Sequence, residues 1–199
     1  MIRARNSLTR PDLWSLEQYA ERRQAFREEV LLHKKHRKIL LGEHLRLIFE
    51  DRLTIQYQIQ EMLRIEKIFE ADAIQQELDA YNPLIPDGAN WKCTLLIQYE
   101  DVEQRKVRLT QLLGIEDQIW VQVGDCAPVF AIADEDMERA NEEKTAAVHF
   151  LRFQLNDDQL AAARGNQALT FGVNHPAYLV EPVKVADENR ASLLADISR

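Results

Sequence analysis

The stretch that decides the fold is KILLGEHLRLIFE, residues 38–50. Two short apolar runs flank Gly42-Glu43, a pair short enough for a hairpin turn. In the second run two sets of side chains alternate, Leu45, Leu47 and Phe49 against His44, Arg46 and Ile48. Alternation with a period of two is typical of a half-buried strand, so these residues predict an antiparallel hairpin.

The residues around the hairpin have a helical period. Residues 9–32 begin with Thr-Arg-Pro-Asp, which is typical of a helix start, and carry a broad apolar face. Residues 51–80 contain no Gly or Pro and predict one long central helix, ended by the prolines of residues 82–88.

The second half of the chain alternates short strands with helices. We expect strands at residues 93–99, 119–123, 129–133, 147–155, 168–173 and 178–183, and helices at 102–113, 156–164 and 186–197, with a helical turn at 134–141. Short links between strands favour an antiparallel sheet. The prediction is a single α+β domain over residues 1–199, with a largely antiparallel sheet packed against an N-terminal, a long central and a C-terminal helix. Residues 1–8 and 198–199 are expected to be flexible.

Composition narrows the class of protein. The 199 residues are 46% hydrophobic and carry a formal charge of −8, which disfavours nucleic-acid binding. We find no secretory signal and no apolar run long enough to span a membrane, so we expect a cytoplasmic protein. Cys93 and Cys126 are then expected to be free thiols.

Charge is unevenly distributed along the chain. Residues 1–50 carry 11 basic and 7 acidic residues, whereas the remainder carries 14 basic and 26 acidic ones. An acidic run at 134–143 is interpreted as a solvated edge, because it lacks the ligand spacing of a calcium-binding loop. The basic region 1–50 and the acidic remainder of the chain are expected to attract each other, within a monomer or across a dimer.

Glu66 is out of place on the predicted central helix. With 100° per residue it falls on the same stripe as Ile55, Ile59 and Met62. A carboxylate among apolar side chains is costly to ionise. An internal ion pair with an arginine is one interpretation, and a functional, metal-binding or protonated carboxyl is the other.

The opposite side of this helix carries Gln56, Gln60 and Arg64. Amide side chains four residues apart, followed by an arginine, form either a solvated face or a polar surface that recognises a partner.

Four histidines are also candidates. His33 and His36 are three residues apart near a helix end, a spacing that allows a shared metal ion completed by His44 or a carboxylate. His149 falls on the apolar side of a predicted strand, as a hydrogen-bonded core residue, a ligand or a base.

Basic side chains surround the first two histidines. Lys34, Lys35 and Arg37 repel a cation, so a basic helix end that complements the helix dipole is the alternative to a metal site. The same three residues are candidates for contact with a partner.

Four stretches resemble a bacterial family of uncharacterised proteins, a domain of unknown function. They are FEDRLTIQYQIQEMLR at 49–64, ELDAYNPLIP at 77–86, AIADED at 131–136 and KTAAVHFLRF at 144–153. Members of that family are often encoded near rubrerythrin-like proteins and iron–sulfur oxidoreductases. The resemblance therefore implies an accessory protein in peroxide defence or electron transfer.

Two functions follow from these observations. The first is an adaptor that acts with a redox partner and has no catalysis of its own, since the chain lacks the cysteine sets and paired Glu-x-x-His motifs of redox-metal proteins. The alternative is a metal- or cofactor-binding protein, which includes an enzyme, centred on Glu66 and His149. No cofactor is predicted apart from that metal ion, and a homodimer is expected on general grounds.

Overall fold

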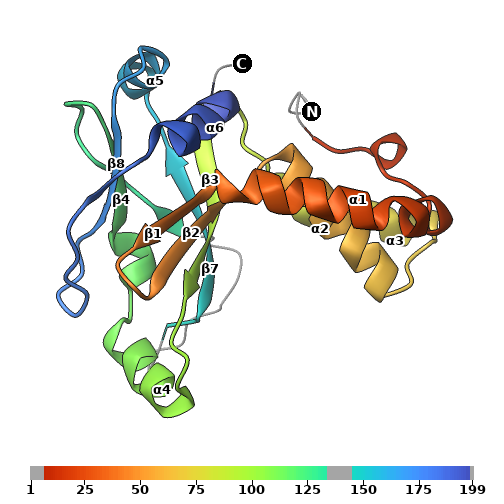
Figure 1. The fold of residues 1–199 in the computed structure, drawn as a ribbon, viewed down its shortest axis with the longest axis horizontal. Helices are drawn as coiled ribbons and strands as arrows, with labels where there is room; N and C mark the ends of the chain where they lie inside the picture. The colour runs from red at the N-terminus through yellow and green to blue at the C-terminus, as the bar shows by residue number, and fades with distance from the viewer. Residues whose placement is uncertain (1–6, 134–144, 198–199) are drawn as a thin grey trace.

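The structure, a computed structural model, describes residues 7–133 and 145–197. Figure 1 shows two lobes, a pair of packed sheets and a helical lobe that projects to one side. The first sheet has the order β1-β2-β3-β7-β6 and the second β5-β4-β8-β9, with every pair antiparallel. The predicted α+β class with a largely antiparallel sheet is therefore confirmed.

The bounds of the elements are as follows. The strands are β1 (Lys38–Leu41), β2 (Leu45–Phe49), β3 (Asn90–Ile97), β4 (Ile119–Val123), β5 (Val129–Phe130), β6 (Ile132–Ala133), β7 (Val148–Gln154), β8 (Leu169–Val173) and β9 (Val183–Lys184). The helices are α1 (Leu16–Lys35), α2 (Arg52–Ile65), α3 (Ala71–Tyr81), α4 (Val102–Gln111), α5 (Asp157–Arg164) and α6 (Asp187–Ile197). Short 3-10 helices occur at Arg10–Asp12, Asn82–Leu84 and Ile115–Gln118. None of the helices in these described ranges is long and apolar enough to cross a membrane.

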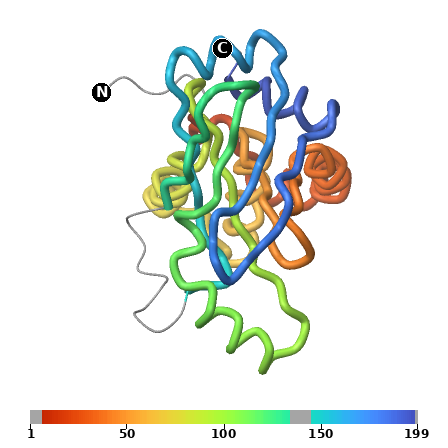
Figure 2. The backbone as a smooth tube through the Cα atoms, turned by 90° about the vertical axis from the view of Figure 1, so that its left-hand side faces the viewer, coloured from red at the N-terminus to blue at the C-terminus, as the bar shows by residue number. Residues whose placement is uncertain are grey.

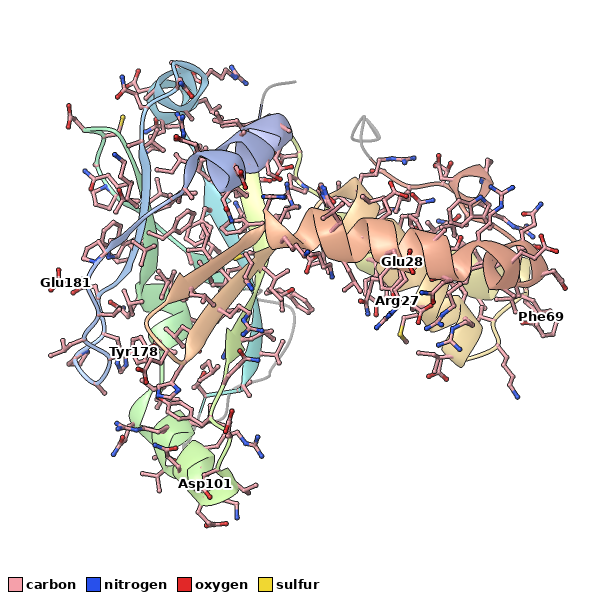
Figure 3. The ribbon with its side chains drawn as sticks, viewed as in Figure 1. Arg27, Glu28, Phe69, Asp101, Tyr178 and Glu181 are labelled. Atoms are coloured by element: carbon pink, nitrogen blue, oxygen red, sulfur yellow. The ribbon has the colours of Figure 1, made fainter. Side chains whose placement is uncertain are left out.

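The predicted hairpin forms from β1 and β2, with Leu41 opposite Leu45. Gly42 has a φ of 68°, and a Cβ there would lie 2.7 Å from the Tyr178 hydroxyl, so the turn requires glycine. That hydroxyl donates to the Leu41 carbonyl and accepts from the His44 N–H. Tyr178 thereby ties the hairpin to the chain that follows β8 (Figure 3).

The main core lies between the two sheets. Phe49 and Phe153 of the first sheet contact Phe171 of the second, with ring centroids 5.3 and 5.5 Å apart. Figure 1 shows the first sheet between the second sheet and the helical lobe, and Figure 2 shows the second sheet nearest the viewer with the helical lobe behind. One face of the first sheet therefore packs in the core, and the other face is on the same side as the helical lobe.

The helical lobe packs around α2. On α1 only Tyr19, Phe26 and Val30 are buried, and they contact α2 and Trp14. The predicted helix at residues 9–32 is divided, because Thr9 caps a 3-10 turn and Ser15 caps α1 separately. Leu8 lies in the range expected to be flexible but is buried; residues 1–6 and 198–199 lie outside the described residues.

The prediction of one long central helix is wrong. Helix α2 ends at Ile65, and α3 starts at Ala71. Lys67 adopts a left-handed conformation with φ 55°, and the Ile68 N–H donates to the Leu63 carbonyl. This is a Schellman ending, a position that usually contains glycine, so the lysine leaves no break in the sequence pattern.

Two predicted strands also differ from the structure. Residues 129–133 form two strands in different sheets, because the Ala131 N–H bonds to β4 as the chain crosses over. Of the predicted strand at 178–183, only its last residue belongs to β9. The predicted turn at 134–141 and the acidic run at 134–143 lie outside the described residues.

Candidate functional site

The most distinctive surface is the solvent side of the first sheet, which we call the outer face. Alternation along four strands and the residue after β2 places its members: Lys38, Leu40, Arg46, Ile48, Glu50, Lys92, Thr94, Leu96, Val148, Phe150 and Arg152. All are exposed or half-buried, whereas their neighbours along each strand are in the core. Apolar side chains occupy its middle, a composition found at protein interfaces.

The charge of the outer face opposes that of the chain. Four of its side chains are cationic and one, Glu50, is acidic, although the protein carries −8 overall. Lys92 lies directly opposite Arg152 on adjacent strands. Like charges directly opposite each other on adjacent strands repel, so the pair concentrates positive charge at this end of the outer face. Arg46 Nε is buried and has no hydrogen-bond partner in the part of the chain that the structure describes.

A cleft of about 330 Å³ lies where the outer face meets the helical lobe. Its polar side chains are Glu50 at the end of β2, Lys92 of β3 and Arg152 of β7. Its apolar wall is formed by Pro83, Leu84, Cys93, Ile132, Ala133, Phe150 and Leu151. The cleft therefore presents cations beside an apolar surface.

The cleft's polar groups are held in place by neighbours. Thr94 Oγ1 donates to Glu50 Oε1 over 2.8 Å, and Lys92 Nζ donates to the Pro83 carbonyl. Arg152 Nη1 donates to Gln154 Oε1 over 2.8 Å.

Glu66 and His149, predicted as one centre, lie apart. Glu66 is exposed at the end of α2, because the helix stops there and the predicted apolar stripe does not continue to it. His149 is buried in β7, as the alternation predicted, and its Nε2 lies 2.8 Å from Thr145 Oγ1 and 3.8 Å from Glu116 Oε2. Burial of Glu66 was a wrong prediction, and the two residues do not form a shared site.

The other predicted histidines also have separate partners. His33 Nε2 lies 2.5 Å from Asp51 Oδ2, and His36 Nδ1 lies 3.2 Å from Glu188 Oε2. His44 stacks on Tyr99 and contacts the Gln98 carbonyl. Within residues 7–133 and 145–197, no three His, Cys, Asp or Glu side chains gather as metal ligands. Cys93 and Cys126 are free, as predicted.

The predicted polar helix face is largely used inside the protein. Gln60 is fully buried, and its amide accepts from the Trp14 N–H at 2.7 Å. Gln56 donates to the Asp12 carbonyl, so both glutamines anchor the segment before α1. Arg64 is exposed and pairs with Glu61.

The basic patch is divided in the same way. Lys35 is exposed and Lys34 half-buried, but Arg37 is 1% exposed, so it is not available to a partner. Arg37 lies between α1 and β1. Its guanidinium donates to the Phe49 and Glu50 carbonyls at the end of β2.

Arg37 belongs to a buried ionic cluster that the sequence did not predict. Its Nη2 lies 2.6 Å from Asp196 of α6, and its Nε lies 3.4 Å from Asp51. Burial raises the pKa of Asp196 to about 6, against the attraction of Arg37. The pKa of Asp51 is lowered despite its burial, by Arg37, the Thr54 N–H and His33. The cluster joins α6 to Arg37, which precedes β1, and to Asp51, which precedes α2.

Fold and surface together define a two-lobed α+β protein with a cationic, partly apolar open face. The chain belongs to the family described as protein of unknown function DUF3501, whose model matches residues 7–197. It is similar to a crystal structure of a novel protein of unknown function from Burkholderia pseudomallei. The two are 51% identical, with a TM-score of 0.91 over 96% of this chain and 99% of that one. No curated protein matches.

Proposed function

We propose that this protein is a cytoplasmic accessory protein that binds a protein partner through the outer face and has no catalysis of its own. The observation that carries the proposal is the combination of cationic and apolar side chains on one open sheet face of an acidic protein. Such a face is complementary to an acidic partner segment with apolar residues.

The nature of the partner follows from the family resemblance. A rubrerythrin-like protein or an iron–sulfur oxidoreductase is the expected partner, and any redox centre belongs to that protein. We do not propose the alternative centred on Glu66 and His149, because Glu66 is exposed and His149 is buried. A homodimer and the lack of nucleic-acid binding stay predictions.

Titration against purified partners tests the proposal. Labelled protein is mixed with a rubrerythrin-like protein or an iron–sulfur oxidoreductase, and the dissociation constant is measured at two salt concentrations. A double variant, Lys38→Glu with Leu40→Asp, changes two exposed residues of β1. We expect at least tenfold weaker binding by this variant, and weaker binding by the wild type at high salt.

The matched control is Lys184→Glu, an exposed cation on β9 of the second sheet. It changes the net charge in the same direction and is expected to leave binding nearly unchanged. Failure of both partners to bind at micromolar concentrations would contradict the redox partnership. Equal weakening by the control and the double variant would contradict the role of the outer face.

A further inference from the structure

The cleft at the end of the outer face has the chemistry of a specific anchor. We propose that it is a carboxylate-binding site, which selects an aspartate or glutamate side chain next to an apolar residue in the partner segment that covers the outer face. This inference rests on the proposed function and specifies the part of the partner that determines recognition.

Arg152 is the residue best placed to bind the carboxylate. A guanidinium has five N–H donors in a planar fork that matches a carboxylate with two parallel bonds. The structure assigns one donor nitrogen, Nη1, to Gln154. Gln154 is itself fixed, since it accepts from Asn90 Nδ2 and donates to the Ala89 carbonyl. The fork is therefore held in one orientation before a ligand arrives, which lowers the entropic cost of binding.

The acidic residue of the cleft lies on the far side of Lys92 from Arg152. The Glu50 N–H bonds to the Lys92 carbonyl on one side, and Lys92 faces Arg152 on the other. Lys92 thus separates Glu50 from Arg152 across the strands, and the Glu50 Oε1 already accepts from Thr94. Arg152 forms no ion pair among the residues that the structure describes, so its positive charge is the one that a ligand carboxylate neutralises.

The apolar wall defines the rest of the ligand. Leu84 from the helical lobe, Ile132 from β6 and Phe150 from β7 line the same cleft as Arg152. A volume of about 330 Å³ is at the lower end of ligand pockets and suits one acidic and one apolar side chain. The cleft therefore distinguishes an acidic–apolar pair from a purely acidic segment.

Two peptides test the inference. One is acetyl-Gly-Asp-Leu-Asp-Val-Asp-Leu-Gly-amide with an uncharged fluorophore, and the other has Asn in place of each Asp. Their dissociation constants are measured with the full chain by fluorescence anisotropy. We expect the wild type to bind the Asp peptide about tenfold more tightly, the effect of one charge-assisted bidentate contact.

Variants show whether Arg152 is responsible. Arg152→Met keeps the apolar stem and is expected to abolish the preference between the peptides. Arg152→Lys keeps the charge without the fork and is expected to retain part of it. Lys184→Met on the second sheet is the control and is expected to retain all of it. An unchanged preference in Arg152→Met, or in Arg152→Lys if Met prevents folding, would overturn the inference.

A competition experiment separates a specific site from a positive surface. Butyrate is expected to displace the Asp peptide more effectively than chloride at equal ionic strength, and equal displacement by the two salts would overturn the inference.

The two proposals fail differently. If Lys38→Glu with Leu40→Asp weakens partner binding while Arg152→Met leaves the peptide preference intact, only the carboxylate site is wrong. If Arg152→Met abolishes the preference while neither redox protein binds, only the proposed function is wrong.

Discussion

Substitution of Asp196 tests how burial of a carboxyl makes the stability of this protein depend on pH. The Asp196 carboxylate is 6% exposed and lies 2.6 Å from the Arg37 guanidinium, with Asp51 and His33 in the same cluster. Burial raises its pKa from 3.8 to about 6, although Arg37 opposes the change. The folded protein therefore holds a proton on Asp196 at pH values where the unfolded chain has released it.

The sign of the pH dependence follows from this difference. A raised pKa stabilises the folded state fully below pH 3.8, and this contribution is lost as the pH rises through about 6. The loss attributable to Asp196 between pH 4.5 and 7 is about 2 kcal/mol. Asp196→Asn cannot ionise, so its unfolding free energy relative to the wild type is expected to rise by that amount across the same interval.

Urea denaturation of both proteins at pH 4.5 and 7 measures the effect. Asp187→Asn is the control, because Asp187 lies in the same helix but is 93% exposed in its side chain. The control is expected to follow the wild type at both pH values. An Asp196→Asn difference that stays the same at pH 4.5 and 7 would refute the assignment of this proton to Asp196.

Three further substitutions have defined outcomes. Glu61→Gln is expected to lower the unfolding free energy by about 1–2 kcal/mol at pH 7 and by almost nothing near pH 2. The reason is that its arginine partners lower the pKa of Glu61 to about 2. Urea titration at both pH values measures this difference. Gly172→Ala places a Cβ 2.2 Å from Trp120, so a loss of about 1–3 kcal/mol is expected, relieved in calorimetry by adding Trp120→Leu. Gln60→Leu removes the acceptor of the Trp14 N–H, and hydrogen exchange at that amide is expected to accelerate by one to two orders of magnitude.

Local signals predicted most of the sheet lobe. Alternation predicted the hairpin of β1 and β2, and the helix predicted at 156–164 forms as α5, where Asn156 accepts from the Gln159 N–H. The break after α2 gave no such signal, because a lysine occupies the left-handed position. The same missed helix end explains the wrong prediction for Glu66. Its predicted burial depended on a helix that continued past it, whereas α2 ends at Ile65.

The candidate site was not predictable from one strand at a time. Each of β2, β3 and β7 shows a half-buried pattern, but only their pairing places Lys92 between Arg152 on one side and Glu50 on the other. The burial of Arg37 was hidden for the same reason: its partner Asp196 is 159 residues away in the chain. Long-range pairing of charges has no local period that a sequence reveals.

The contacts of α6 have a consequence for synthesis on the ribosome. Arg37 Nη1 bonds to the Ser192 carbonyl, and the Trp91 indole bonds to the Leu193 carbonyl. Both donors emerge long before their acceptors are translated, so the nascent chain holds an incomplete junction until α6 has been made. A chain arrested or cleaved before α6 would keep the pair of Arg37 with Asp51 but lose the closer one with Asp196, and the Trp91 indole would lose its acceptor. The junction around Arg37 and Trp91 is therefore among the last parts of the described fold to close during synthesis.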